Sequence, residues 1–166
     1  MKYFFTITCL IFFFILFKSL QKDPQLLPSN LISKEVPKFS INTFKNSNFS
    51  NIDLENEKVV IVNFFASWCP PCRIEHKNLL ELSKYTKVFG VAKKNKKNDL
   101  LLWLEELGNP YKKIAMDYDG LLSIDWGVYG LPETFLIVNG FIKYRHVGPI
   151  MERDLEIFNN FTKGLK

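Results

Sequence analysis

The sequence Trp68-Cys69-Pro70-Pro71-Cys72, directly after the apolar run Val59–Phe65, constrains this chain more than any other feature. Two thiols separated by two residues can close a small disulfide ring or open to a dithiol. A helix that begins at the first thiol directs its N-terminal amides and partial positive charge at that sulfur, which favours the reactive thiolate. The motif therefore predicts thiol–disulfide exchange.

Other uses of paired cysteines fit this sequence less well. A structural zinc site needs a second pair of Cys or His ligands, and the chain offers only Cys9 and two separated histidines. Covalent haem attachment needs a His directly after the second cysteine, where this chain has Arg73. A copper chaperone spaces its cysteines more widely, and an inert disulfide in so small a ring stabilises weakly. We therefore expect no metal and no separate cofactor, with the Cys69–Cys72 disulfide as the redox centre.

Length and charge restrict the function further. The 166 residues, 47% of them hydrophobic, suffice for one domain with an appendage. The net charge of +5 comes from scattered lysines, with few arginines. Phosphate recognition favours arginine forks on a basic face, so we expect no nucleic-acid binding. The lysine-rich tract at 93–97 is interpreted as a solvated loop.

The N-terminus carries an apolar run at 3–17, between Lys2 and Lys18. A cleaved signal peptide has a similar length but ends in small residues around the cut, and the residues Lys18-Ser19-Leu20-Gln21-Lys22 show no Ala-x-Ala pattern. We therefore predict an uncleaved membrane anchor or signal at 1–20, a Pro-containing linker at 21–34 and an exported domain at 35–166. Cleavage remains the alternative.

Hydrophobic periodicity predicts alternating strands and helices in the domain. The predicted strands are 36–41, 59–65, 88–92, 114–116, 134–138 and 141–146. The predicted helices are 72–85, 100–107 with a cap at Asn98 or Asp99, 121–126 and 151–162. Asn139-Gly140 predicts a hairpin between the last two strands, and the Asn- and Ser-rich segment 46–56 is predicted to be a loop.

Two acidic residues are candidates for proton transfer. Glu75 lies three residues after Cys72 on the same helix face, and Glu133 follows Pro132. A carboxylate near a buried thiol can take its proton as that thiol attacks a mixed disulfide, and partial burial would raise the carboxyl pKa toward the working pH. The alternative for Glu75 is an ordinary solvated helix position. Pro132, taken by itself, is an ordinary trans proline before a strand.

The Cys pair after a buried strand, with Pro132 before the hairpin, resembles the thioredoxin fold. The resemblance implies an α/β domain with a central mixed sheet flanked by helices. It also implies a cis proline opposite the thiols, which leaves the preceding backbone free to pair with a substrate strand. Asn63 occupies the place where thioredoxin carries a buried acid.

More narrowly, the chain resembles the membrane-anchored thiol–disulfide oxidoreductases of bacterial cytochrome c maturation, the CcmG/DsbE type. The stretches that carry this resemblance are 68–75, Gly108-Asn109-Pro110-Tyr111, Asp117-Tyr118-Asp119-Gly120 and 127–137. The resemblance implies that Cys69 is the attacking thiolate and Cys72 the resolving thiol. It further implies that Trp68, Leu131 and Pro132 align the substrate.

The same resemblance implies partners and a location. The expected substrate is apocytochrome c or a cytochrome c maturation protein, and the expected electron donor is a membrane thiol reductase. The expected location is the bacterial inner membrane, with a single-pass anchor and the catalytic domain in the periplasm. Two alternatives stay open: a general exported thioredoxin-like oxidoreductase, and a non-enzymatic metal- or haem-handling module on the same fold.

Overall fold

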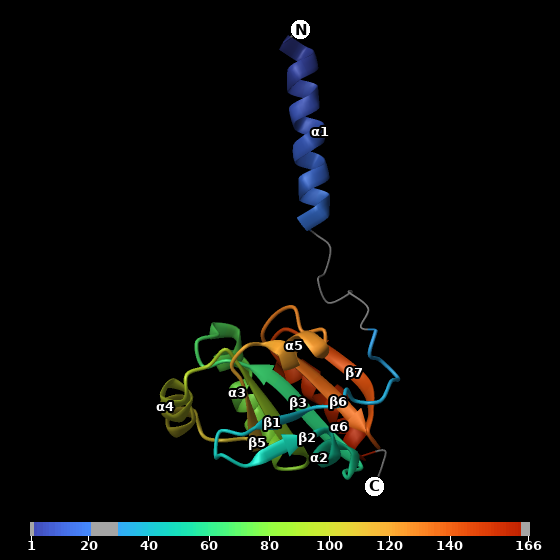
Figure 1. Cartoon of the computed structure of the whole chain (residues 1–166). Helices are drawn as coiled ribbons and strands as arrows, with labels where there is room; N and C mark the ends of the chain where they lie inside the picture. Colours follow the sequence, from blue (N-terminus) through green and yellow to red (C-terminus); the bar gives the residue numbers. More distant parts are fainter. Residues whose placement is uncertain (1, 21–29, 164–166) are drawn as a thin grey trace.

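Five strands form one mixed sheet, in the spatial order β5-β4-β3-β6-β7 (Figure 1). Their bounds are β3 (Val59–Phe65), β4 (Lys87–Lys93), β5 (Tyr111–Asp117), β6 (Glu133–Val138) and β7 (Phe141–Val147). The strands β3, β4 and β5 are parallel, whereas β6 runs antiparallel to both β3 and β7. The predicted central mixed sheet is confirmed. The structure is a computed structural model, and it describes residues 2–20 and 30–163.

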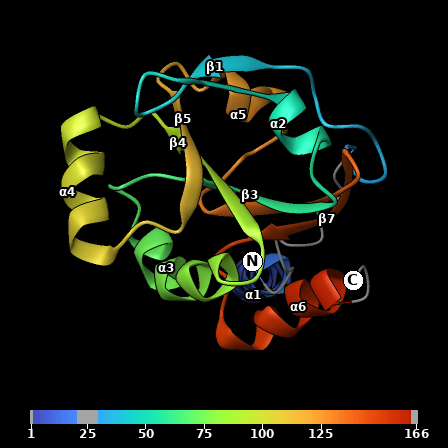
Figure 2. The ribbon, with the colours of Figure 1, turned by 90° about the horizontal axis from the view of Figure 1, so that it is seen from below.

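Helices cover both faces of this sheet (Figure 2). On one side lie α3 (Pro70–Ser83), α4 (Lys97–Leu107) and α6 (Leu155–Lys163); on the other lie α2 (Asn51–Glu55) and α5 (Leu121–Asp125). Because β3 is covered on both faces, its sequence is a nearly unbroken apolar run. Its one polar residue, Asn63, is fully buried. Strand alternation places Asn63 on the α3 side, with Ile61 and Phe65.

Each side of the sheet has its own aromatic core. On the α3 side, the ring of Phe65 stacks on those of Tyr111 and Trp103, with centroid distances of 4.6 and 5.2 Å. On the other side, Trp126 packs against Phe64 at 5.4 Å. Burying one such side chain stabilises the fold by about 1.5–3 kcal/mol. These two aromatic cores hold α3 and α5 against the sheet. They thereby position the segments that join the strands to these helices, which lie at the top of the sheet in Figure 1.

The segment before β3 crosses the sheet from one edge to the other, with a β-bridge to β7 at Glu35 and one to β5 at Thr43. The strands in this region are β1 (Ser40–Asn42) and β2 (Asn48–Ser50), paired with each other in a separate sheet. The prediction of an edge strand over 36–41 is therefore wrong in position. Pro37 has no N–H to donate, so the first part of that segment joins no ladder.

The prediction of a loop over 46–56 is also wrong, because this segment contains β2 and α2. Phe49 and Leu54 are fully buried and fasten it to the sheet. The backbone N–H of Ser50 donates to Oδ2 of Asp53 at 3.0 Å, which stabilises the first turn of α2. Two well-placed apolar residues thus outweigh a polar local composition.

Other element boundaries differ by small amounts from the sequence prediction. α3 begins at Pro70 rather than at residue 72, since prolines in a first helical turn lose no helical hydrogen bond. The cap of α4 is Lys96, not Asn98 or Asp99. The predicted closing helix is divided into a short 3-10 helix, η2 (Glu152–Asp154), followed by α6.

The predicted hairpin between β6 and β7 is present. Asn139 and Gly140 have φ values of 50° and 78°, as a two-residue turn with both central residues in the left-handed region requires. The hairpin reverses the chain, so that β7 runs back toward the end of the sheet at which β6 begins. Residues at the start of β6 and at the end of β7 therefore lie side by side.

Helix α1 (Lys2–Leu20) precedes the sheet domain (Figure 1). Over 3–18 its side chains are exposed, apart from the half-buried Cys9. Among the described residues, no helix combines the length and the apolar character needed to cross a membrane. The anchor at 1–20 is not shown and stays a prediction. Most of the predicted linker, 21–29, lies outside the described residues.

Candidate active site

Cys69 and Cys72 form a disulfide at the N-terminus of α3. Cys69 is the N-cap residue, and its Sγ accepts the backbone N–H of Cys72 at 3.3 Å. Pro70 and Pro71 fill the first two helical positions and have no N–H, so this amide is the first donor that the helix offers. That amide and the helix dipole stabilise a thiolate at Cys69. The start of α3 at Pro70 therefore places the two sulfurs unequally.

The Leu131-Pro132 peptide bond is cis, as the resemblance implied. Strand β6 begins at the next residue, and Glu133 pairs with Phe64 near the end of β3. Pro132 therefore lies beside the strand end that leads into the Cys pair. Leu131 is half-buried and packs against both cores.

Trp68 lies on the β4 side of the Cys pair, whereas Pro132 lies on the β6 side. Its indole N–H donates to the carbonyl of Lys94 at 3.2 Å, while 60% of the residue remains exposed. The hydrogen bond fixes one edge of the ring and leaves its face open to a partner. This position agrees with the predicted role of Trp68 in substrate alignment, which remains a prediction.

Glu75, one turn after Cys72 on α3, is fully buried. Its Oε1 accepts from Nδ2 of Asn63 at 2.8 Å, and its Oε2 accepts the backbone N–H of Ile150 at 3.0 Å. Burial raises the pKa of this carboxyl from 4.5 to about 8, and the two hydrogen bonds partly oppose that rise. The solvated alternative for Glu75 is therefore wrong. A buried carboxyl of this pKa can accept or release a proton near neutral pH.

The partners of Glu75 come from segments far apart in the chain. Asn63 also donates from Nδ2 to Oγ1 of Thr134 at 3.0 Å, and its Oδ1 accepts the hydroxyl of Tyr111 at 2.9 Å. Neither Thr134 nor Tyr111 was among the predicted site residues. The available signals were the lone polar residue in an apolar strand and the stretches 127–137 and Gly108–Tyr111 that carry the resemblance.

Glu133 is also fully buried, but its contacts differ from those of Glu75. Its Oε1 accepts the backbone N–H groups of Tyr129 and Gly130 at 2.9 and 3.0 Å. Its Oε2 pairs with the guanidinium of Arg145, which also donates to the carbonyl of Gly127. Strand alternation directs Glu133 to the opposite face of β6 from Thr134, away from the Glu75 side. This geometry favours positioning of the loop before Pro132 over the predicted proton transfer.

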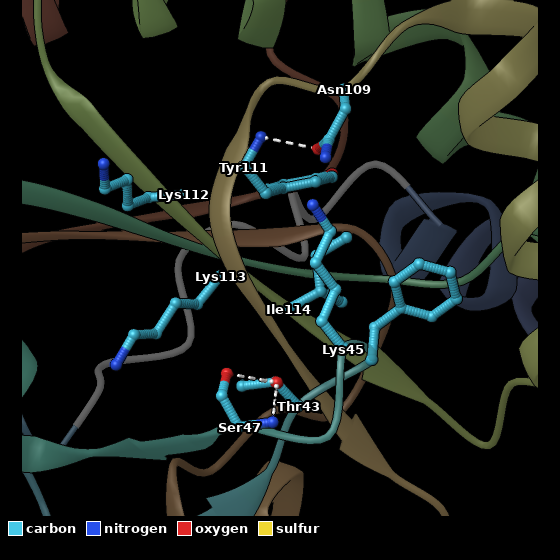
Figure 3. A pocket seen from close by; sticks show the side chains of 9 residues that line it. Thr43, Lys45, Ser47, Asn109, Tyr111, Lys112, Lys113 and Ile114 are labelled. Carbon is cyan, nitrogen blue, oxygen red and sulfur yellow. Dashed lines mark hydrogen bonds between the residues drawn. The ribbon is translucent and has the colours of Figure 1, made fainter.

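Within 2–20 and 30–163, no three His, Cys, Asp or Glu side chains gather closely enough to hold a metal ion. A hollow of about 70 Å³ lies between the β1–β2 turn and β5, lined in part by Lys45 and Lys112 (Figure 3). None of the predicted site residues lines this hollow.

A mixed sheet with a Cys-x-x-Cys disulfide at a helix N-terminus and a cis proline beside it defines a thiol–disulfide oxidoreductase of thioredoxin fold. Comparison with known proteins agrees with this class. Residues 32–160 match the redoxin family. The chain belongs to that family and, within it, to the CcmG/DsbE type of thiol:disulfide interchange protein.

Relatives of this chain share most of its length. It is 47% identical over 135 residues to the thiol:disulfide interchange protein DsbE of Escherichia coli K12, covering 79% of this chain and 73% of that protein. The DsbE homolog of Paracoccus denitrificans is 42% identical over 137 residues, covering 81% and 76%. A solved thiol:disulfide interchange protein of the thioredoxin family from Chlorobium tepidum has a TM-score of 0.65 at 28% identity, over 79% of this chain and 94% of that one. The protein is a disulfide oxidoreductase, as predicted.

Proposed function

We propose that this protein reduces disulfides of apocytochrome c, or of a protein that handles apocytochrome c during cytochrome c assembly. The observation that carries the proposal is the presence of two features at the start of α3. Sγ of Cys69 accepts a helix amide, and Glu75 is buried one turn beyond Cys72. The first arrangement suits an attacking thiolate, and the second suits a proton acceptor for the resolving thiol. The resemblance of this chain to the cytochrome c maturation type supports the substrate.

The first step uses the reduced form of the Cys pair. The Cys69 thiolate attacks one sulfur of the substrate disulfide, so that a bond forms between Cys69 and that sulfur and the substrate S–S bond breaks. The other substrate sulfur leaves as a thiolate and takes a proton from solvent. The exposed ring of Trp68 and the backbone before Pro132 flank the Cys pair and would align the substrate chain.

The second step resolves this mixed disulfide. Cys72 gives its proton to Glu75 and attacks Sγ of Cys69, which releases the remaining substrate sulfur as a thiolate. The Cys69–Cys72 disulfide forms, and two electrons have passed from the Cys pair to the substrate. Because burial raises the pKa of Glu75 to about 8, its carboxylate form is a stronger base than an ordinary carboxylate, and this form becomes more populated as the pH rises toward 8.

The oxidised protein must then be reduced again. We propose a membrane thiol reductase as the donor of these two electrons, since the periplasm is kept oxidising. A location at the bacterial inner membrane, with the domain in the periplasm, brings the enzyme to that donor. A single-pass anchor there would need the apolar run at 3–17 to be extended by Leu20 and by the apolar stem of Lys18.

The test is a covalent trap made with the full chain. Cys72→Ser keeps the attacking thiol and removes the resolving one, so the mixed disulfide should accumulate in cells of the native host. We expect few trapped partners, among them an apocytochrome c or a dedicated maturation protein. A variant with both cysteines changed to Ser should trap nothing and serves as the matched control.

A deletion strain provides the second measurement. We expect mature c-type cytochromes to fall, while other exported disulfide proteins stay at normal levels. Many unrelated partners in the trap, with normal cytochromes in the deletion strain, would instead favour a general exported thioredoxin-like oxidoreductase. Metal or haem binding that needs both thiols, without disulfide reduction, would favour the non-enzymatic module.

A further inference from the structure

Tyr111 reaches from the edge strand β5 across β4 to the centre of the sheet. Its hydroxyl donates to Oδ1 of Asn63 on β3 at 2.9 Å. Strand β4 lies between β5 and β3, and its residue Gly90 pairs with Asn63. A Cβ on Gly90 would lie 2.9 Å from ring atoms of both Tyr111 and Phe65. The missing side chain at Gly90 therefore provides the space that the Tyr111 ring occupies.

The Tyr111 hydroxyl donates to the oxygen of the Asn63 amide, which favours one of the two orientations of that amide. Because Oδ1 accepts from the hydroxyl, Nδ2 is turned toward Oε1 of Glu75 and Oγ1 of Thr134, at 2.8 and 3.0 Å. An N–H donor stabilises the ionised carboxylate. If the amide turned over, Oδ1 would face Glu75, and only a protonated carboxyl could donate to it.

We propose that Tyr111 is a positioning residue of the redox centre, which acts through Asn63 to hold Glu75 ready to accept a proton. The proposal rests on the proposed function, in which Glu75 receives the proton of Cys72. It names a residue that contacts Asn63 rather than the reacting sulfurs. It gives a role to the buried hydroxyl of Tyr111 and to the buried amide of Asn63.

The segment Gly108-Asn109-Pro110-Tyr111 supports this role. The side chain of Asn109 accepts the backbone N–H of Tyr111 at 2.9 Å and fixes the start of β5 (Figure 3). The carbonyl of Gly108 accepts from Nε2 of His76 at 3.0 Å, and His76 is the residue after Glu75 on α3. The segment therefore contacts the proton-transfer region from two sides, through His76 and through Tyr111.

Several titratable groups surround Glu75 on the elements packed against it. They are Cys72 and His76 on α3, Tyr111 on β5, His146 on β7 and, on the far face of β6 and β7, the Glu133–Arg145 pair. Burial lowers the pKa of His76 and raises that of Tyr111 well above its usual value. His146 lies against the carbonyl of Pro149 at 3.3 Å, with Asp154 at 3.9 Å. Tyr111 thus stays a donor while Glu75 titrates.

The test is the direct titration of Glu75 in the full-length oxidised protein. Carbon-13 NMR of labelled glutamate follows its carboxyl, and Glu75→Gln identifies the signal. In Tyr111→Phe the amide loses its preferred orientation, so the Glu75 midpoint should rise by about one pH unit, the equivalent of one hydrogen bond. Thr134→Val removes the other partner that holds the amide and should shift the midpoint in the same direction. It serves as a second variant if Tyr111→Phe does not fold.

Tyr144→Phe is the matched control, because it also removes one tyrosine hydroxyl, here from β7. Among the hydrogen bonds of the described residues, Tyr144 makes none to Asn63. Its Glu75 midpoint should not move. An unchanged midpoint in a folded Tyr111→Phe or Thr134→Val protein would overturn the proposal. A merely structural role for Tyr111 would lower stability without moving the midpoint.

The rate at which a mixed disulfide is resolved separates this proposal from the proposed function. With a small aromatic disulfide as substrate, the pH profile of resolution should shift with the Glu75 midpoint in Tyr111→Phe. In a Glu75→Gln background, Tyr111→Phe should have no further effect on that profile. If the midpoint shifts but the profile does not follow, the positioning role stands and the proton transfer proposed for Glu75 fails.

Discussion

The backbone N–H of Cys72 donates to Sγ of Cys69 across 3.3 Å, in the first turn of α3. The contact is asymmetric, since it favours negative charge on Cys69 and offers nothing to the sulfur of Cys72. Glu75 is buried one turn further along α3, and in the function proposed above it receives the proton of Cys72. In the proposed function, one helical turn therefore separates the attacking Cys69 from the resolving Cys72.

In the reduced protein, we expect alkylating reagents to modify Cys69 before Cys72. The helix amide stabilises the Cys69 thiolate, and the residue exposes 4% of its surface against 1% for Cys72. Timed labelling with iodoacetamide followed by peptide mass spectrometry measures both rates, with Cys9→Ser in every sample to remove the third thiol. Faster modification of Cys72 would reverse the assigned roles.

The free energy of unfolding should depend on pH through Glu75. Its pKa is raised in the folded state from 4.5 to about 8, so the folded protein holds this proton more tightly than the unfolded chain. The protonated Glu75 carboxyl stabilises the folded state by a few kcal/mol. This contribution to the free energy of unfolding is fully present below pH 4.5 and is lost as the pH rises to about 8.

Glu75→Gln isolates this effect, because Gln does not titrate and its altered hydrogen bonding adds a constant offset at every pH. Urea denaturation of both oxidised proteins should show that wild-type stability falls relative to the variant across that interval. Parallel pH profiles would show that Glu75 titrates alike in folded and unfolded chains.

Breaking the buried pair between Glu133 and Arg145 should be costly. Arg145→Met leaves the Glu133 carboxylate buried without its cation, which we expect to lower the free energy of unfolding by about 3–5 kcal/mol. The double variant Glu133→Gln/Arg145→Met should lose less than the sum of the two single variants. The exposed pair of Arg73 with Glu106 is the control, where Arg73→Met should cost about 1 kcal/mol or less.

Trp68→Ala should impair protein substrates more than small ones. Its ring is 60% exposed and makes one hydrogen bond, to Lys94, so stability should change little. We expect kcat/KM to fall about tenfold for a protein disulfide, the equivalent of losing one aromatic contact. A small aromatic disulfide should react as before. Tyr85→Ala removes a similarly exposed ring just beyond the C-terminal end of α3 and should affect neither substrate. Equal losses for both substrates would contradict docking by Trp68.

The redox motif and most of the sheet were predictable because local sequence carries their physics. An unbroken apolar run indicates a strand covered on both faces, and prolines after Cys69 fit the first turn of a helix. Asn139-Gly140 selects the left-handed turn of a hairpin. By contrast, 46–56 looked like a loop, since its strand and helix depend on the burial of Phe49 and Leu54 against distant residues.

Sequence alone determined the chemistry of this protein through two thiols near the start of a helix and an acid one turn further on, whereas the place of Pro132 opposite them came from the resemblance and the structure. It could not decide whether Glu75 was solvated or functional. Tertiary packing decided that, because the Glu75 pKa depends on burial and on donors from Asn63 and Ile150, which lie far away in the chain. The same packing paired Glu133 with Arg145 and turned it toward the loop before Pro132. Desolvation and hydrogen bonding are set by three-dimensional neighbours, and residue spacing does not encode them.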